Sequence, residues 1–157
     1  MTQVDSMQVD TTLRERRGAF VSLKRKTDGA LRGCVGFVEP RYPLFEAVAR
    51  AAVAAASSDF RFPPVVRSEL RSLAVQVSAL GPLSAIPPER IEVGVHGLVV
   101  RCDGRGGLLL PQVATELGWG REELLDGACV KAGLPARAWR RPDAVILAFT
   151  AQVFGED

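Results

Sequence analysis

Residues 31–36, with the sequence LRGCVG, combine a charge, a thiol and two glycines in one short stretch. Side chains alternate between the two faces of a strand, so a strand here places Arg32 and Cys34 on one face, about 7 Å apart. A nearby guanidinium favours the thiolate, which is the reactive form of cysteine, and Gly36 on the same face leaves open space beside the thiol. Cysteine also packs as a small apolar residue, so Cys34 is either reactive or part of the core.

His96 is the single histidine of the chain and lies between two glycines of a strand-like segment. Histidine is the side chain best suited to accept a proton at neutral pH, so His96 is the candidate general base. A histidine in a turn also commonly serves structure alone. The other two thiols, Cys102 and Cys129, fall on apolar faces and fit the core. One histidine and widely spaced cysteines do not support a transition-metal site.

Two further segments offer side chains that suit ligand binding. In DFRFPPV, residues 59–65, Arg61 precedes two prolines that stiffen the loop, and a guanidinium there suits a carboxylate or a phosphate. The alternative is that Asp59 and Arg61 pair with each other or cap the end of the preceding helix. In LLLPQ, residues 108–112, Gln112 begins a helix. Its amide suits a hydrogen bond to a ligand, or only to the loop backbone.

Residues with special backbone properties accompany these candidates. We expect five of them to shape the site: Gly33, Gly36, Pro63, Gly97 and Pro111. Such residues gather where loops are positioned for function. The sequence therefore predicts that five side chains converge on one cleft: Arg32, Cys34, Arg61, His96 and Gln112. Cys34 and His96 are the candidate catalytic residues and the other three are candidate substrate-binding residues. The alternative is that each special residue serves its own turn.

The elements that must position these side chains follow from apolar periodicity and turn signals. Residues 18–24 and 31–38 are predicted to pair as a hairpin across a turn at residues 27–29. Further strands are predicted at residues 73–80, 91–102, 106–111 and 144–154. Helices are predicted at residues 44–58, 67–71, 112–117 and 121–132. Tight hairpins recur and strands do not alternate strictly with helices, which favours an α+β fold with an antiparallel sheet.

Length and composition suit one compact domain over residues 13–157, preceded by a disordered polar tail over residues 1–12. The sequence has no apolar run long enough for a transmembrane helix and no visible signal peptide. Three separated cysteines fit reduced thiols and a cytoplasmic location. A net charge of +2 with 6% aromatic residues argues against a nucleic-acid partner, and a membrane partner is not expected.

Several segments together resemble the AMMECR domain family, from about residue 13 to residue 154. The segments that carry the resemblance include GAFVSLK, LRGCVGFVEPRYPLFEAV, DFRFPPV, VGVHGLVV and GGLLLPQVATELGW. The resemblance implies an antiparallel sheet flanked by helices, with a large and a small subdomain in one domain. It implies no established catalytic activity and no particular cofactor.

Some relatives of this family are fused to, or encoded beside, a Memo-like domain and a radical SAM protein, an association called the AmmeMemoRadiSam system. The resemblance therefore implies a ligand- or partner-binding component of a shared modification pathway. The alternative is a small thiol-dependent enzyme or group carrier that uses Cys34 with His96 as base. The chain departs from the family where relatives often have proline at the position of Phe60, where a helix usually precedes the first strand, and where Gly120 replaces a polar helix cap.

Overall fold

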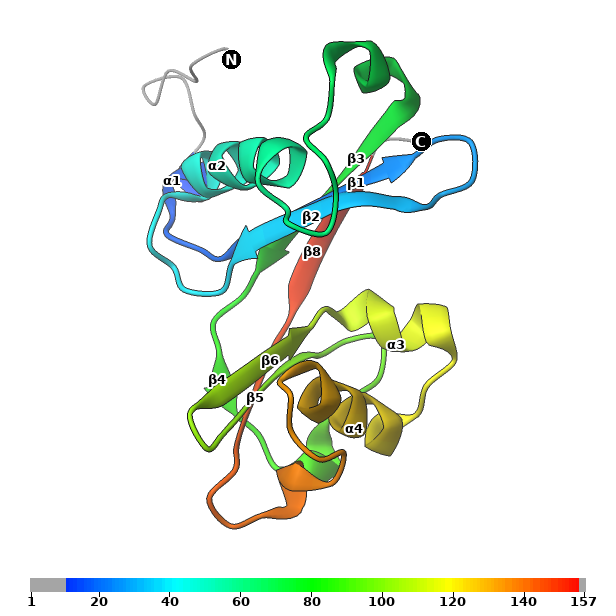
Figure 1. Cartoon of the computed structure of the whole chain (residues 1–157). Coiled ribbons are helices and arrows are strands. Elements are labelled where there is room, and N and C mark those ends of the chain that lie inside the picture. Colours follow the sequence, from blue (N-terminus) through cyan, green and yellow to red (C-terminus); the bar gives the residue numbers. More distant parts are fainter. Residues whose placement is uncertain (1–10, 156–157) are drawn as a thin grey trace. The chain divides into compact units, whose positions relative to one another are not determined.

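The computed structural model describes residues 11–155, which divide into two units (Figure 1). Residues 11–80 and 152–155 form the first unit, and residues 81–151 form the second. Each unit contains a four-stranded sheet and at least one helix. The predicted α+β class with antiparallel pairing is confirmed, and the strands form two sheets rather than one. The predicted tail lies almost wholly outside the described residues; the short helix α1 spans Thr11–Arg14.

The sheet of the first unit has the order β2-β1-β3-β8. Its strands are β1 (Ala19–Arg25), β2 (Leu31–Phe37), β3 (Leu73–Leu80) and β8 (Ala151–Gly155). The central strand β1 pairs antiparallel with both β2 and β3. The predicted hairpin of the first two strands is therefore confirmed. Its turn uses Gly29 at a φ of 71°, a conformation that favours glycine.

Helix α2 (Leu44–Ser57) packs on one face of this sheet (Figure 1). Apolar side chains of β1, among them Val21 and Leu23, are buried with Ala51 and Ala55 of α2. The small alanine side chains let the helix approach the sheet closely. After α2 the chain runs through an irregular segment that contains Pro63 and then a 3-10 helix, η2 (Arg67–Ser72), before it enters β3.

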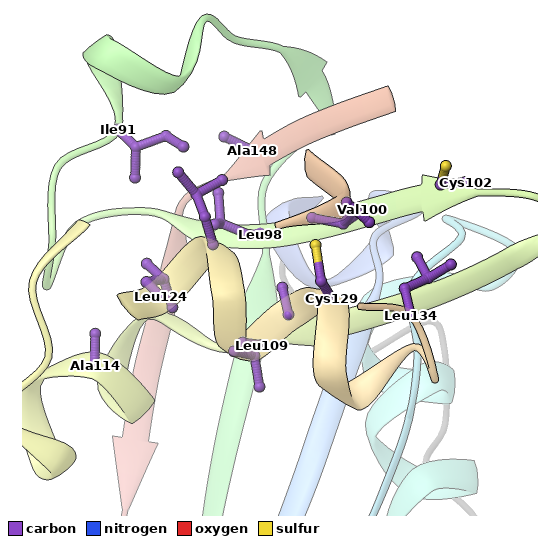
Figure 2. Close-up of a cluster of buried hydrophobic side chains, with 13 residues drawn as sticks. Ile91, Leu98, Val100, Cys102, Leu109, Ala114, Leu124, Cys129, Leu134 and Ala148 are labelled. Carbon is purple, nitrogen blue, oxygen red and sulfur yellow. The ribbon is translucent and has the colours of Figure 1, made fainter. Parts of the chain in front are cut away.

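The second unit has the sheet order β4-β7-β5-β6. Its strands are β4 (Ser84–Ala85), β5 (Gly97–Cys102), β6 (Arg105–Leu109) and β7 (Val145–Phe149). Its helices are α3 (Pro111–Leu117), α4 (Arg121–Lys131), η3 (Pro88–Arg90) and η4 (Ala138–Arg140). The β5–β6 hairpin turns at Asp103 and Gly104, both with positive φ, as the sequence predicts. Figure 2 shows the apolar cluster between α4 and β5.

Helix α4 follows its sequence signals closely. Its predicted apolar stripe is buried at Leu124, Leu125, Ala128 and Cys129. Gly133, directly after the C-cap, has a φ of 79°, which is the usual glycine helix stop. At the other end, the backbone N–H of Gly120 donates to Glu123 Oε1 at 3.3 Å, so the first turn is partly capped without a polar cap side chain.

Two strand predictions are wrong in extent. The strand predicted over residues 91–102 begins only at Gly97, because residues 92–96 form a turn with Gly94 at a φ of 87°. The strand predicted over residues 144–154 is two strands, β7 and β8, interrupted at Thr150. These two strands belong to different sheets. Apolar alternation is the same in both, and only the long-range pairing separates them.

None of the helices in residues 11–155 combines the length and apolar character that a bilayer crossing requires.

Candidate functional site around Cys34

Two buried polar side chains contact Cys34. Within residues 11–155, four polar or charged residues are buried: Ser22, Arg32, Asp59 and Ser78. All four lie in the first unit, and two of them contact Cys34 directly. Burial of a charge is costly unless the charge is paired and hydrogen-bonded, so the partners of Arg32 and Asp59 define what this site is built to hold.

The thiol of Cys34 is half-buried and receives a hydrogen bond from a neighbouring strand. Cys34 lies opposite Ser22 in the β1–β2 register, and Ser22 Oγ donates to Cys34 Sγ at 3.3 Å. The other two thiols differ, because Cys102 and Cys129 are both buried in the cluster of Figure 2. Burial is the main cause that raises the pKa of each of them. Cys34 is therefore the most accessible of the three thiols.

The backbone of Cys34 is held by the ion pair of Asp59 and Arg61. β2 is an outer strand of its sheet, and the N–H of Cys34 donates to Asp59 Oδ2 at 3.0 Å. Arg61 Nη2 donates to the carbonyl oxygen of Cys34 at 3.4 Å. The pair thus satisfies both backbone groups of one residue, as a neighbouring strand would. The alternative prediction, that Asp59 and Arg61 pair with each other, is confirmed.

Four hydrogen bonds converge on the carboxylate of Asp59. Besides the N–H of Cys34, it accepts from the backbone N–H, Nε and Nη2 of Arg61 at 3.1, 3.0 and 2.7 Å. The hydrogen bonds from the Arg61 side chain are the largest cause that holds the pKa of Asp59 well below its usual range, and burial opposes them. The pKa of Arg61 is raised, mainly by its hydrogen bonds to Asp59 and further by the charge of Asp59, and burial opposes this rise.

The two members of this pair differ in exposure. The side chain of Asp59 is 4% exposed and that of Arg61 is 47% exposed. One side of the guanidinium therefore faces solvent while the other side holds the carboxylate. Phe60, between them in the chain, is 97% exposed. We call the surface formed by Cys34, Phe60 and Arg61 the Cys34 edge.

Arg32 is committed to a carboxylate of η2. The register of β1 and β2 shifts between Leu23 and Lys24, and Arg32 is the residue of β2 that falls outside the register, as in a β-bulge. Its Nε and Nη2 donate to the two carboxylate oxygens of Glu69 at 3.0 and 3.3 Å. This bond is the largest cause that lowers the pKa of Glu69. The predicted effect of Arg32 on the thiol stays a prediction; the guanidinium bonded to the Cys34 backbone is that of Arg61.

The glycines of this strand serve close packing. A Cβ added at Gly33 would lie 2.2 Å from the carbonyl oxygen of Ala55, so glycine is what lets the end of α2 approach β2. A Cβ at Gly36 would lie 2.4 Å from Cγ of Phe20, the residue opposite it in β1. The open space predicted beside the thiol at Gly36 is therefore wrong, because the ring of Phe20 fills it.

His96 closes a turn in the second unit. Its ring Nδ1 accepts a hydrogen bond from the backbone N–H of Glu92 at 3.0 Å. The backbone N–H of His96 donates to the carbonyl oxygen of Glu92, also at 3.0 Å. Accepting at Nδ1 leaves the ring proton on Nε2 in this arrangement, so the imidazole presents a donor rather than a base. The base role of His96 stays a prediction, and it requires that Nδ1 lose the hydrogen bond from the backbone N–H of Glu92.

The remaining candidates also lie in the second unit. Gln112 is half-buried in the first turn of α3, after the buried Pro111. A Cβ added at Gly97 would lie 2.3 Å from Cζ of Phe149, so this glycine admits an aromatic ring. Arg32, Cys34 and Arg61 belong to the first unit. The convergence of all five side chains on one cleft stays a prediction.

One further cluster has the ligand types of a metal site. Atoms of Cys102, Asp103 and Asp143 lie within 4.8 Å of one another. Arg141 already donates to both carboxylates, at 2.7 Å to Asp103 and 3.0 Å to Asp143. The guanidinium thus takes the place that a cation would need, and the cluster is an ion-pair network between a hairpin turn and the segment before β7.

Comparisons with known proteins agree with the sequence resemblance. The family model described as AMMECR1 matches residues 1–154. The chain belongs to the AMMECR1 family. A relative from Methanopyrus kandleri, Protein MK0488, is 50% identical over 153 residues, which cover 92% of this chain and 74% of the relative. A relative from Methanothermobacter thermautotrophicus is 48% identical, over 92% of this chain and 78% of its own length.

A solved crystal structure is also similar to this chain. The crystal structure of the uncharacterised protein PH0010 from Pyrococcus horikoshii has a TM-score of 0.93 and 42% sequence identity. The match covers 99% of this chain and 82% of that chain. The similar crystal structure therefore supports the fold, and the names of these relatives state no reaction.

Sequence reasoning missed two partners at the Cys34 edge and its surroundings. Ser22 was detectable, because the predicted hairpin pairs it with Cys34 once the turn length is set. Glu69 carried no signal, because it lies 37 residues from Arg32 and its element is a short 3-10 helix.

Proposed function

We propose that this AMMECR1-family chain is a binding component of a modification pathway that includes a Memo-like protein and a radical SAM protein, with no catalytic activity of its own. The partner binds at the Cys34 edge. The observation that carries the proposal is that the charged side chains near Cys34 are bonded to the protein itself. Asp59 and Arg61 hold the Cys34 backbone, and Arg32 binds Glu69.

A nucleophilic cysteine needs a group that takes its proton or holds its thiolate. Ser22 acts as a hydrogen-bond donor to Cys34 Sγ, which polarises the sulfur but does not remove its proton. The charged side chains nearby form ion pairs, Arg32 with Glu69 and Arg61 with Asp59. The arrangement therefore favours rigid presentation of a surface over activation of the thiol.

The Cys34 edge has the features of a binding surface. Phe60 exposes nearly its whole ring, and aromatic side chains and arginine are the residues most often decisive at protein interfaces. The loop that carries Phe60 is held by the bonds of Asp59, by the N–H of Phe62 to the Asp59 carbonyl at 3.1 Å, and by prolines. A loop backbone held in place before binding loses little conformational entropy on association.

The test is direct titration of the chain with the Memo-like protein of the same organism. We expect saturable binding for the native chain and for Cys34→Ser, because the thiol is a neighbour and not a reactant in this account. Absence of binding to both the Memo-like protein and the radical SAM protein overturns the proposal.

The alternative, a thiol-dependent enzyme or group carrier that uses Cys34, is supported by one observation. Cys34 is the half-buried thiol, beside a hydroxyl donor and a half-exposed guanidinium. Its test is the rate of alkylation by iodoacetamide near neutral pH. A Cys34 rate that far exceeds the rate of the same thiol in the urea-unfolded chain supports activation and counts against the binding proposal.

A further inference from the structure

Positive charge is concentrated in two short segments of the first unit. Residues 24–32 and 67–72 together contain six basic and two acidic residues, which gives them a net charge of +4. The whole chain has a net charge of +2, so all its other residues together have a net charge of −2. The two segments are therefore a local excess of positive charge and not a sample of a uniformly basic protein.

The fold brings these two segments together. Arg25, the last residue of β1, lies opposite Leu73, the first residue of β3. The backbone N–H of Lys26 donates to the carbonyl oxygen of Ser72, the last residue of η2, at 2.8 Å. The β1–β2 hairpin turn and η2 therefore lie at the same end of the first-unit sheet (Figure 1).

The two acidic residues leave most of this positive charge uncompensated. Glu69 is bonded to Arg32, and the charge of Arg25 is only a lesser cause, after that bond, of the lowered pKa of Glu69. Asp28 lies exposed in the hairpin turn, where it accepts the backbone N–H of Ala30 at 2.9 Å. Four exposed cations form no hydrogen bond or ion pair with another side chain of residues 11–155: Arg25, Lys26, Arg67 and Arg71.

Exposed apolar side chains accompany these cations. Leu31 is 36% exposed and Leu70 is 57% exposed. Each leucine is next in the chain to one member of the ion pair of Arg32 and Glu69, which ties β2 to η2. We call the surface formed by these side chains the basic end: Arg25, Lys26, Leu31, Arg67, Leu70 and Arg71.

We propose that the basic end binds an acidic segment of a partner polypeptide that also carries apolar side chains. Three of its four free cations are arginines, and the planar guanidinium matches the geometry of a carboxylate. Complementary charge orients the partner and speeds its association, and apolar side chains of the partner cover the leucines. The proposal is independent of the function proposed for the Cys34 edge, because the two surfaces share no residue.

Two other anionic partners fit this surface less well. Residues 24–32 and 67–72 contain no aromatic side chain, and single-stranded nucleic acids are usually held by bases stacked on aromatic rings. The hairpin turn over residues 27–29 has the sequence TDG. It therefore offers an acidic side chain, which anionic headgroups repel, and no apolar side chain that inserts among lipids.

The test measures binding of a model peptide by fluorescence anisotropy. The probe is a labelled peptide of glutamates with leucine at every third position, titrated with the full chain. We expect saturable binding that weakens as salt is raised, because salt screens exposed charges. Arg71→Glu weakens it more than about tenfold, since repulsion replaces attraction. Leu70→Ser weakens it by about threefold or more, since less apolar surface is buried.

Arg90→Glu is the matched control, because it makes the same change of charge at an exposed position of η3 in the second unit. We expect it to leave the affinity nearly unchanged. Arg67→Glu repeats the test at a second position of η2, and circular dichroism verifies that each variant is folded.

Three results overturn the proposal. The first is equal affinity of the native chain and Arg71→Glu, or equal weakening by Arg71→Glu and Arg90→Glu. The second is a peptide of glutamates alone that binds as tightly as the peptide with leucines. The third is tighter binding of single-stranded DNA, or of phosphatidylserine vesicles, than of the peptide, which assigns the basic end to that partner instead.

Discussion

Replacement of Asp59 by asparagine removes the charge that holds the Cys34 backbone while it retains the shape of the side chain. The carboxylate accepts four hydrogen bonds, three of them from Arg61, and its side chain is 4% exposed. Hydrogen bonds to charged groups contribute about 1.5–3 kcal/mol each. Arg61 is half-exposed, so water compensates part of the loss. We expect Asp59→Asn to lower the free energy of unfolding by about 2–3 kcal/mol at neutral pH.

The effect depends on pH in a direction that follows from the lowered pKa of Asp59. An unfolded aspartate has a pKa of about 3.9. The stabilisation by the folded carboxylate is therefore complete above that value, and it is lost as the pH falls toward the lower folded pKa. The difference between the native chain and Asp59→Asn shrinks as the pH is lowered from about 5 to about 3.

Asp143→Asn is a matched control, because Asp143 also pairs with an arginine two residues away, but on the surface. That pair, with Arg141, has side chains 54% and 45% exposed. Exposed ion pairs contribute about 0–1 kcal/mol, so we expect a smaller effect. Urea unfolding followed by far-UV circular dichroism measures both variants.

Hydrogen exchange of peptides from β2 assigns the effect of Asp59→Asn to the Cys34 edge. Both tryptophans of the chain, Trp119 and Trp139, belong to the second unit, and their fluorescence therefore follows that unit separately. Equal destabilisation by Asp59→Asn and Asp143→Asn, or a difference that does not change with pH, refutes the reasoning.

Three other predictions concern the elements beside the site. Gly33→Ala lowers the free energy of unfolding by about 1–3 kcal/mol or prevents folding. A second change, Ala55→Gly, does not restore this stability, because the added methyl group clashes with the backbone carbonyl oxygen of residue 55. Urea unfolding of the single and double variants checks this prediction. Arg32→Met and Glu69→Gln are non-additive in a double-mutant cycle of urea unfolding, and additive effects contradict the pairing seen here. His96→Phe speeds hydrogen exchange of the amide that donates to its ring, and exchange that stays unchanged shows that this bond is not formed in solution.

Local signals were sufficient for much of the fold. The turn at residues 27–29, the glycine stop of α4 and the Asp103-Gly104 hairpin each depend on a few neighbouring residues, and the structure has all three. The pairing of Asp59 with Arg61 belongs to the same class, because only Phe60 lies between the two charged residues and prolines follow. These features are predictable because the physics that determines them lies within one turn or one helix end.

The features that sequence reasoning missed depend on contacts between distant segments. The register shift at Arg32 and its bond to Glu69 require the position of η2 beside β2. The filling of the space at Gly36 by the ring of Phe20 requires a side-chain conformation that alternation does not specify. The division of residues 144–154 between two sheets requires the strand order of the whole chain. Periodicity indicates which face is apolar, and it does not indicate which neighbour covers that face.

Calorimetric titration of the chain with the Memo-like protein of the same organism, using a pair of surface variants, tests the central claim most directly. Phe60→Ser alters the Cys34 edge, and Val130→Ser alters an exposed position of α4 in the second unit, 61% exposed. Burial of a phenylalanine ring contributes about 1.5–3 kcal/mol, so we expect Phe60→Ser to weaken binding by about 10- to 100-fold and Val130→Ser to leave it unchanged. Equal affinity of Phe60→Ser and the native chain contradicts the assignment of the Cys34 edge as the binding surface.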